Sequence, residues 1–510
     1  MKAALTTLIL LLTGPAWAPA WAQAPRAREA FDLSLAVSVI SAALAFIAPR
    51  ALDPVSVQQL ALWGLSAPGS LDSALATELR DGTVVLLQDG KLVFTRPVPQ
   101  DNSPDAWGAL VADVLDAATR ASPAFRTAGL RGALTSFFDE LFNHLDPYSR
   151  YVAPGAADLD RAKRSGEAGA GIQVTRDRQG FVVASVNADG PGAEAGIRTG
   201  DRIVAVDGQP TAGEDLETVQ GWIRGDEGSD FTMTVRSRGG PARTLDIERA
   251  ITPPETVFPK RMNDILFIRI AGFSVDTDQR LSRELERNLS GPLGKPIRGI
   301  VLDLRGNRGG RLRESIAAID LLLDRGLIAV TSGRDPEAAH TWRANHGDLA
   351  ERRPIVVLVD GRTASAAEIM AAALSDQGRA VVVGSATLGK GLVQTIKNLP
   401  DGGELFVSWS RVLAPRGWPI QGLGVLPQLC TSLGPDAMTA QLQSLDRGVQ
   451  PMAQAIARHR GARAPLPAAE ALALRNTCPA SEARDTDLTA ARFLITHPNA
   501  YAAALLTPPP

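Results

Sequence analysis

Residues 355–394, IVVLVDGRTASAAEIMAAALSDQGRAVVVGSATLGKGLVQ, decide the fold, and the rest of the chain is organised around them. The unbroken apolar run at 355–359 has the length of a buried strand, and the turn at 360–361 interrupts it. Residues 366–374 have a helix-forming composition without Gly or Pro. This order predicts an α/β core and places Ser365 at the start of a helix.

Ser365 has two physical uses at a helix start. Its hydroxyl can cap the helix by accepting a free backbone N–H, which is the common role of serine there. It can also act as a nucleophile, because a helix N-terminus offers unpaired N–H groups and a positive dipole end where an oxyanion would develop. A nucleophile also needs a base.

Lys390 is the candidate base. It follows a second predicted buried strand at 381–383 and lies between two glycines. An exposed lysine has a pKa of about 10.4 and stays charged near neutrality, but burial against apolar strands lowers that pKa by several units. Gln394 would lie on the same face of a following strand, where its amide could orient the amine.

A phosphate-binding loop is the rival interpretation of this segment. Residues 384–390 fit the pattern G-x-x-x-x-G-K after a buried strand. However, Gly391 stands where the magnesium-binding Ser or Thr should be, and the segment at 392–399 is short and runs into Pro400. No long helix is predicted to supply a phosphate-binding N-terminus, so we reject the nucleotide site.

Four motifs together resemble the carboxy-terminal processing, or tail-specific, peptidases. Their order and mutual spacing make the match specific, although no single motif is decisive, and the match covers roughly residues 125–430. The motifs are GRTASAAE (361–368), LGKGLVQ (388–394), VLDLRGNRGG (301–310) and IQGLGVLP (420–427). The resemblance implies a serine endopeptidase on a crotonase-like or Clp-protease-like α/β catalytic core.

The resemblance also implies roles for particular residues. Three would act as nucleophile, general base and positioning amide, in this order: Ser365, Lys390 and Gln394. The backbone amides of Gly310 and Ala366 would form the oxyanion hole, with Gly309 as the alternative to Gly310. Three positions depart from the family's usual Pro, Phe and Asp, in this order: Arg308, Leu388 and Gln428. None of these makes or breaks bonds, so the departures bear on substrate preference.

Residues 166–250 form a compact unit in which short strands are predicted at 181–186, 202–206, 231–236 and 243–248, and an amphipathic helix at 214–224. The motifs GAGI (169–172) and GIRTGDRIVAVDG (196–208), together with this element order, resemble a PDZ domain. A PDZ domain binds an extended peptide by strand addition. The resemblance implies that the peptide's carboxylate meets the amides of Gly169, Ala170, Gly171 and Ile172. Three residues on one helix face would line the side-chain pocket, namely Leu216, Val219 and Ile223.

The N-terminus has the pattern of a secretory signal peptide. Residues 1–22 carry Lys2, a short apolar run and the ending Ala20-Trp21-Ala22. A second apolar stretch at 31–48 is interrupted by polar residues, so we expect a buried helix that ends at Pro49. The alternative is a membrane-retained form. The two cysteines, Cys430 and Cys478, could pair in an exported protein or remain two free thiols.

The domain organisation follows from these patterns. A hairpin is predicted at 83–95 around Asp89-Gly90, and a helix with an apolar face begins near 125 and runs into DPYSRY at 146–151. The predicted units are a signal peptide at 1–22, a mostly helical N-terminal domain at 23–164, a PDZ domain at 165–251, a catalytic domain at 252–430 and a helical tail at 431–510. The sequence alone indicates no role for the tail.

The sequence lacks the residue patterns of a Ser-His-Asp hydrolase, a metal site or a nucleic-acid-binding protein. A Ser-His-Asp hydrolase needs a committed imidazole, and all five histidines lie in polar or peripheral stretches, namely His144, His340, His346, His459 and His497. Neither H-E-x-x-H nor a paired-Cys cluster is present, so we expect no metal and no cofactor. The net charge of −2 on 510 residues gives no basic excess for nucleic acid.

We therefore expect an exported serine endopeptidase, periplasmic or extracellular, that binds C-terminal or unfolded tails through its PDZ domain and cleaves through an acyl-enzyme at Ser365. Its partners would be polypeptides with free C-termini; membrane association and a homo-oligomer are left open. One alternative is a catalytically silent PDZ scaffold. Another is an acyl-CoA enzyme on the same core, which would leave the PDZ domain and the signal peptide without a purpose.

Overall fold

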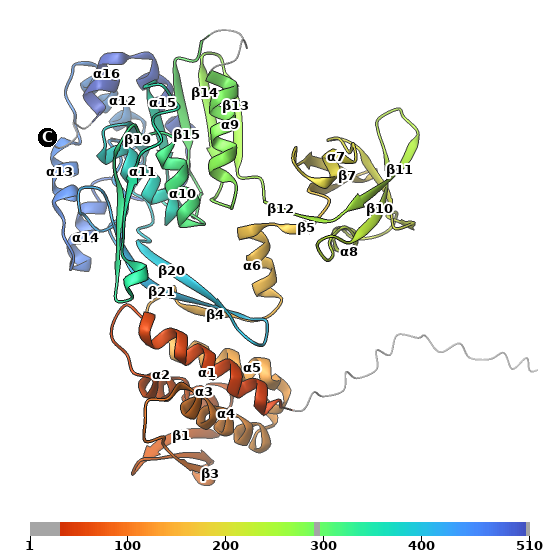
Figure 1. Ribbon diagram of the computed structural model, residues 1–510. Helices are drawn as coiled ribbons and strands as arrows, with labels where there is room; N and C mark the ends of the chain where they lie inside the picture. The colour runs from red at the N-terminus through yellow and green to blue at the C-terminus, as the bar shows by residue number, and fades with distance from the viewer. Residues whose placement is uncertain (1–30, 290–295, 506–510) are drawn as a thin grey trace, which may run out of the picture.

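The computed structural model describes residues 31–289 and 296–505, and Figure 1 shows a mixed α/β molecule with helices at both ends. The signal peptide predicted at 1–22 lies outside the described residues. A six-stranded sheet forms the centre, and its strand order is β13 (Val257–Met262), β14 (Ile265–Ile270), β15 (Gly299–Asp303), β18 (Ile355–Val359), β19 (Ala380–Gly384) and β22 (Leu429–Cys430). Only the β13–β14 pair within this sheet is antiparallel.

Both faces of the central sheet are covered by helices, which explains why its inner strands are apolar throughout. Ile355, Val357 and Val359 face a core shared with α9 (Thr277–Leu289), α10 (Leu312–Asp320) and α11 (Ala366–Asp376). Val356 and Leu358 face the tail helices, which are α12 (Pro435–Asp446), α15 (Asp485–Thr496) and α16 (Pro498–Ala504). The tail therefore completes the core of the central sheet (Figure 1).

A second sheet joins the central sheet region to the N-terminal helices. Its order is β17 (His340–Ala344), β16 (Gly326–Gly333), β21 (Glu404–Leu413) and β20 (Leu392–Asn398), and β4 (Arg150–Val152) also pairs with β21. Leu405 and Val407 on β21 are buried in the same hydrophobic cluster as the N-terminal helices. Strand β20 begins two residues after Lys390, so this sheet continues from residues 385–391, the irregular segment that we call the lysine loop.

The N-terminal part consists of helices with a small sheet. The helices are α1 (Leu33–Arg50), α2 (Val57–Gly64), α3 (Ala67–Leu71), α4 (Pro104–Ala121) and α5 (Pro123–Phe142); the strands are β1 (Leu75–Arg80), β2 (Thr83–Gln88) and β3 (Lys91–Pro97). The β2–β3 pairing confirms the predicted hairpin.

Helix α1 does not end at Pro49, as we expected, but continues to Arg50, and the N–H of Ala51 still donates to Ile47 O. The fixed φ of proline fits a helix, and its ring lies in the last turn, where one lost hydrogen bond costs little. By length and composition, α1 is the one described helix that could cross a membrane. Its residues Val39, Ile40 and Leu44 are fully buried in the N-terminal core, which supports the buried-helix interpretation.

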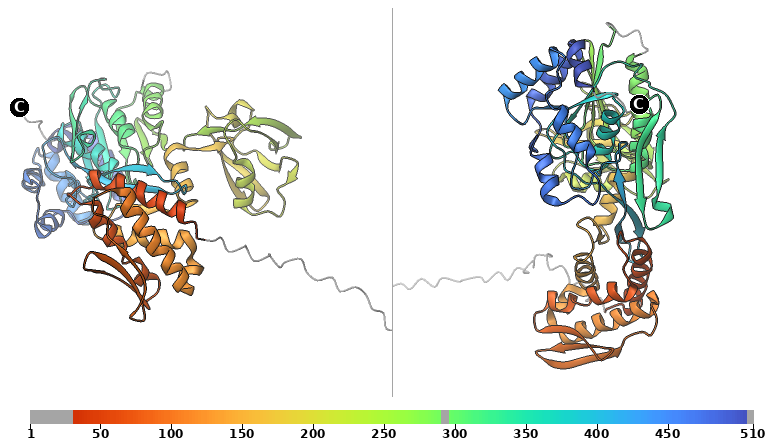
Figure 2. Two further views of the ribbon diagram at one scale, coloured as in Figure 1. Left: turned by 60° about the horizontal axis from the view of Figure 1, so that its bottom comes forward. Right: turned by 90° about the vertical axis from the view of Figure 1, so that its left-hand side faces the viewer.

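Residues 166–252 form a separate lobe that stands away from the rest of the molecule (Figure 2). Its sheet has the order β11 (Ala242–Glu248), β10 (Asp230–Arg236), β8 (Arg202–Val206), β7 (Gly180–Val186) and β6 (Ile172–Asp177), with β9 (Gln209–Pro210) on β8 and helices α7 (Pro191–Glu194) and α8 (Leu216–Ile223). The lobe enters through β5 (Glu167–Gly169) and leaves through β12 (Ala250–Thr252), which pair with each other. Helix α6 (Ala156–Ser165) leads into it.

Candidate active site

Ser365 sits on a sharp turn between β18 and α11. The Asp360 carboxylate shapes this turn by accepting the backbone N–H groups of Arg362 at 3.0 Å and Thr363 at 2.9 Å. Ser365 has φ 58° and ψ −123°, a conformation that costs a non-glycine residue about 1–3 kcal/mol. The same strained strand-to-helix turn lifts the nucleophile of other hydrolases above its sheet. Ser365 is also the N-cap of α11, and its N–H donates to Glu368 Oε2 as in a capping box, so the strained backbone and the helix-cap role occur together.

The glycine loop after β15 lies against this turn. A Cβ on Gly309 would come within 2.8 Å of Ser365 Cβ and 3.0 Å of Ala366 N, so only glycine permits this approach. The N–H of Gly309 is already used, since it donates to Asn307 Oδ1 at 2.8 Å. Within the described residues, the N–H groups of Gly310 and Ala366 donate no hydrogen bond. This difference favours Gly310 over Gly309 as an oxyanion donor.

Lys390 is half-buried in the irregular segment between β19 and β20. Its Nζ donates to Gln394 Oε1 at 3.3 Å and lies 4.9 Å from the centre of the Tyr148 ring. Burial lowers the pKa of Lys390, and the nearby charge of Arg150 lowers it further, against the opposing charges of Asp146 and Glu368. A lysine in this setting holds a neutral amine at lower pH than a free lysine does.

Gln394 is fixed by a segment that the sequence analysis did not connect to the site. Its Nε2 donates to Tyr148 O at 2.5 Å. The chain at Tyr148 is anchored in turn, because Ser408 N donates to Ser149 Oγ at 2.9 Å and Ser408 Oγ donates to Asp146 Oδ1 at 2.7 Å. The motif DPYSRY gave a signal, but only the pairing of β4 with β21 brings it beside Gln394.

Glu368 forms hydrogen bonds both with the turn that carries Ser365 and with the loop that carries Lys390. This fully buried carboxylate accepts four hydrogen bonds: Oε1 accepts from Thr387 Oγ1 at 2.5 Å and Gly389 N at 2.7 Å, and Oε2 accepts from Ser365 N at 2.8 Å and Lys390 N at 2.9 Å. Burial raises the pKa of Glu368, and the four hydrogen bonds counter that rise. Because Ser365 N and Lys390 N share one oxygen, Glu368 sets the spacing of the predicted dyad.

The dyad itself is not closed in this structure. Among the described residues, Ser365 Oγ and Lys390 Nζ form no hydrogen bond, and the amine points to Gln394 instead. Catalytic hydrogen bonds are often long or absent without substrate and form in the complex. The backbone geometry therefore brings the two residues together, while proton transfer requires the Lys390 side chain to turn toward Ser365.

The rival chemistries fit less well. A strand, β20, follows Lys390 where a phosphate-binding loop requires a helix. His346 Nδ1 lies 2.6 Å from Asp320 Oδ2, a His–Asp pair that the sequence analysis did not foresee. Asp320 ends α10, whereas the glycine loop precedes that helix, so roughly 13 Å of helix separates the pair from the Ser365 turn.

A hollow in the 166–252 lobe contains most of the predicted peptide-binding residues. Gly169, Ala170, Gly171 and Ile172 line it, and the N–H groups of Ala170 and Gly171 make no hydrogen bond within the described part of the chain. The lining residues at the end of α8 are Gln220 and Ile223, and Arg224 directly after the helix also lines the hollow. Val219 is fully buried in the lobe's core, and neither it nor Leu216 is among the lining residues.

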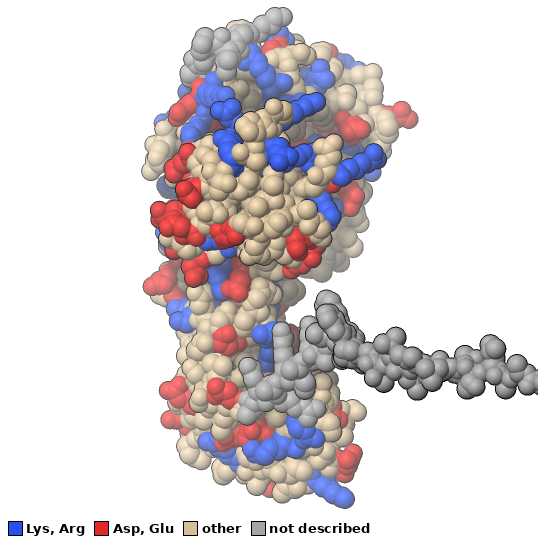
Figure 3. All heavy atoms as spheres, turned by 90° about the vertical axis from the view of Figure 1, so that its right-hand side faces the viewer, with Lys and Arg blue, Asp and Glu red and all other residues tan. Residues whose placement is uncertain are grey.

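Helix α6 adds a wall to this hollow that the sequence did not indicate, through Leu159, Ala162 and Lys163. Leu159 is 54% exposed, which leaves an apolar side chain available to a bound peptide. Figure 3 shows side chains of both charge signs spread over the face that carries the lobe, with uncharged areas between them. This face of the molecule therefore carries no single uniform charge.

Comparisons with known proteins agree with this architecture. Residues 264–430 match the model of peptidase family S41, and residues 182–237 match a PDZ domain model. The carboxy-terminal-processing protease of Bartonella bacilliformis is 36% identical over 288 residues, which are 56% of this chain and 66% of that protein. The chloroplastic C-terminal processing peptidase of Tetradesmus obliquus is 31% identical over 329 residues, covering 59% of this chain and 68% of that protein.

A solved structure, the photosystem II D1 C-terminal processing protease, is 26% identical and matches with a TM-score of 0.35, covering 75% of this chain and 97% of that one. The aligned part is 66% of the Bartonella relative, just under two thirds of its length. The family models and the relatives confirm the predicted family and the predicted fold class, an α/β peptidase core with a PDZ domain and helices at both ends. The chain belongs to the carboxy-terminal processing peptidases of family S41, which are serine-type proteases.

Proposed function

We propose that this chain is an exported serine endopeptidase that cleaves C-terminal or unfolded polypeptide tails through a Ser/Lys acyl-enzyme mechanism. One observation carries the proposal: the backbone N–H groups of Ser365 and Lys390 both donate a hydrogen bond to Glu368 Oε2. That arrangement joins a strained serine to a half-buried lysine whose pKa is lowered by burial. Two unused N–H groups beside the serine supply the site for an oxyanion.

The chemistry follows from these groups. Neutral Lys390 Nζ takes the proton of Ser365 Oγ as the oxygen attacks the scissile carbonyl, and the N–H groups of Gly310 and Ala366 stabilise the negative charge on the carbonyl oxygen. The lysine then gives its proton to the leaving amine, which departs as the new N-terminus. Water attacks the remaining ester after losing a proton to Lys390, and that proton returns to Ser365 Oγ as the product carboxylate leaves.

The PDZ lobe supplies substrate recognition in this proposal. A substrate's terminal carboxylate would accept the unused N–H groups of Ala170 and Gly171, while its side chains contact Ile223 and Leu159. Export rests on the signal-peptide pattern at 1–22 and on the Cys430–Cys478 disulfide, which is typical of oxidising compartments. We place the enzyme in the periplasm or outside the cell.

A fluorophosphonate probe tests the nucleophile. We expect the wild type to be labelled and the Ser365→Ala variant to be neither labelled nor able to cleave an unfolded test protein, because alanine has no hydroxyl to acylate. Thermal unfolding of both proteins provides the control, since alanine keeps the strained turn and should leave Tm nearly unchanged. A wild-type protein that binds the test protein but resists the probe and never cleaves would favour the silent PDZ scaffold.

Amidation of the substrate's C-terminus tests the recognition step. The amide removes the negative charge to which the N–H groups of Ala170 and Gly171 point, so we expect binding to weaken and KM to rise about tenfold. A fall in kcat as well would mean that peptide binding in the lobe helps to assemble the dyad. Equal KM and kcat for the free acid and the amide would remove the carboxylate-binding role.

A further inference from the structure

The tail reaches both turns that carry the predicted dyad. Residues 475–481, which we call the tail strap, begin at the last residue of α14 (Ala468–Arg475) and contact the segments that follow β18 and β19. Ser481 O accepts the N–H of Gly361 at 2.7 Å, in the turn before Ser365. Cys478 O accepts the N–H of Ala386 at 3.2 Å, in the loop that leads to Lys390. One short segment of the tail thus bonds to the backbone of both catalytic turns.

Arg475 occupies a notch built for it beside Lys390. Its Nη1 donates to Leu388 O and to Leu423 O, each at 3.2 Å, and so ties the lysine loop to the loop at 420–427. The notch exists because two glycines form its walls: a Cβ on Gly389 or Gly424 would come within 3.0 or 2.9 Å of this nitrogen. Burial lowers the pKa of Arg475, while the charge of the buried Glu368 opposes that shift.

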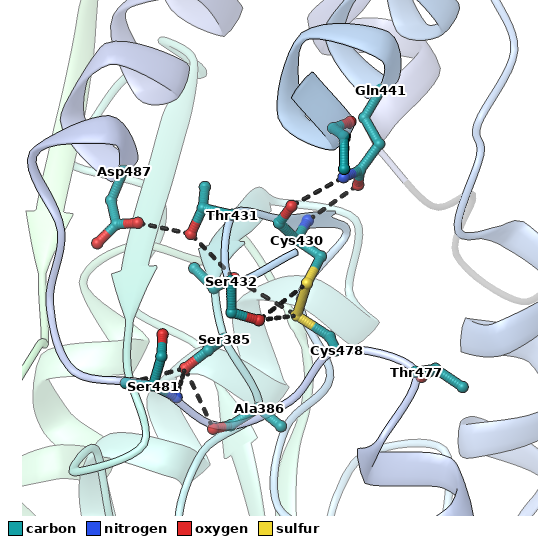
Figure 4. The surroundings of a disulfide bond; sticks show 12 residues. Ser385, Ala386, Cys430, Thr431, Ser432, Gln441, Thr477, Cys478, Ser481 and Asp487 are labelled. Carbon is teal, nitrogen blue, oxygen red and sulfur yellow. Dashed lines mark hydrogen bonds between the residues drawn. A yellow bond between two sulfur atoms is a disulfide. The ribbon is translucent and has the colours of Figure 1, made fainter. Parts of the chain in front are cut away.

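The disulfide anchors the strap at its centre (Figure 4). Cys478 is bonded to Cys430 at the end of β22, which resolves the choice that the sequence left open. Both cysteines are fully buried, and Cys478 Sγ lies 3.5 Å from Gly384 O at the end of β19. Ser385 Oγ donates to Ser481 O and accepts the N–H of Ser481, both at 3.1 Å. The strap is therefore fixed on the side of the sheet from which the lysine loop leaves.

We infer that the tail strap positions the lysine loop for catalysis, with Arg475 as the positioning residue and the Cys430–Cys478 disulfide holding the strap in place. The inference rests on the proposed role of Lys390 as the general base. Leu388, Gly389 and Lys390 form a short loop without regular structure, held by Glu368 on one side and by Arg475 on the other. Loss of either support lets the amine move away from Ser365.

The Arg475→Ala variant tests the inference in the full chain. Because a displacement of about 1 Å can cost 10²-fold in rate, we expect kcat to fall about 10- to 100-fold while KM changes less than about twofold. The rate-against-pH profile should also shift to higher pH, because a loosened loop hydrates Lys390 and raises its pKa toward that of a free lysine. Arg475→Lys retains a cation and a donor, so it should recover part of kcat and return the profile toward the wild type.

Hydrogen exchange supplies a readout that does not depend on proteolysis. We expect the amides of Gly389 and Lys390 to exchange at least about tenfold faster in Arg475→Ala. Arg463→Ala is the matched control, because this arginine lies in the same tail but donates to Arg460 O and Ala462 O within it. The double variant Cys430→Ala with Cys478→Ala should reproduce the loss of kcat and of amide protection.

The outcomes separate this inference from the proposed function. Wild-type kcat, pH profile and amide protection in Arg475→Ala would overturn the positioning role even if the wild type is an active protease. An equal loss in Arg463→Ala would also overturn it, because the effect would then belong to the tail in general. If the wild type cleaves nothing, the proposed function fails, and faster exchange at Gly389 and Lys390 in Arg475→Ala alone would still show that the strap holds the loop.

Discussion

Lys390→Arg should lose nearly all of its activity at every pH at which the wild type cleaves. Arginine keeps the positive charge and the length of the side chain, but its guanidinium holds its proton above pH 12 and so cannot accept one from Ser365 Oγ. We expect a loss of about 10²- to 10⁴-fold in kcat, the usual contribution of a general base. Steady-state rates on an unfolded test protein, measured beside Lys390→Ala, give the comparison. Retained cleavage in Lys390→Arg would remove the lysine from the base role.

The wild-type rate should rise with pH because only the neutral amine is a base. Burial lowers the pKa of Lys390, so the rise should be complete well below the pKa of about 10.4 that a free lysine has. Arg150→Gln should move the rise to higher pH, because the charge of Arg150 is the second cause of the lowered pKa. A profile that is flat from pH 6 to pH 10 would contradict the assignment.

The lowered pKa of Lys390 also makes folding stability depend on pH. The direction of this dependence is opposite to that for a lysine held in an ion pair, whose folded pKa is raised. Since the folded pKa of Lys390 lies below the unfolded value, the unfolded chain binds more protons between the two values, and stability rises with pH across that window. At pH values below the folded pKa, Lys390 is charged in both states, and the full free-energy cost of burying that charge lowers the stability of the folded protein. Lys390→Met should therefore unfold at the same or a higher temperature near neutral pH, which separates loss of catalysis from loss of folding.

The sequence indicated the reacting residues because their chemistry is local. The strand, turn and helix around Ser365 follow from apolar runs and a turn, and the pattern of 355–394 predicted that order, which the structure confirms in β18, α11 and β19. The predicted roles of Ser365, Lys390 and Gln394 remain proposals, although Glu368 joins the backbones of Ser365 and Lys390 and the Lys390 amine donates to Gln394. Motif spacing thus located the segment that carries the candidate reacting residues.

The contacts that hold the candidate residues in place come from distant parts of the chain and could not be predicted in the same way. Tyr148 meets Gln394 across 246 residues and Arg475 meets Leu388 across 87, and neither contact leaves a periodic signal in the sequence. Val219 shows a related limit of predicting pocket residues from helical spacing. Helical spacing placed it on the face with Ile223, but an eight-residue helix packed on a small sheet buries that face in its own core. The periodicity identified the inward face without showing which of its residues reach the hollow.

Glu368→Gln should lower both stability and kcat, because no neutral side chain can satisfy this site. The two carboxylate oxygens accept four donors, and three of these are backbone N–H groups that cannot turn away. A glutamine offers one oxygen and one NH₂, so at least one backbone N–H must face another donor. Each unsatisfied buried donor costs about 1–3 kcal/mol, so we expect the free energy of unfolding to fall by about 2–5 kcal/mol.

The catalytic part of this prediction follows from the shared oxygen. If Glu368 Oε2 sets the spacing of Ser365 and Lys390, then kcat should fall about 10- to 100-fold in Glu368→Gln even far below its Tm, while KM stays near the wild-type value. Glu482→Gln is the control, because that carboxylate is 80% exposed and pairs only loosely with Arg362 at 3.6 Å, so its effect should stay within about 0.5 kcal/mol. A Glu368→Gln enzyme that loses stability but keeps full kcat at low temperature would reduce Glu368 to a structural residue, and the spacing of the dyad would then have to come from the Arg475 side of the loop alone.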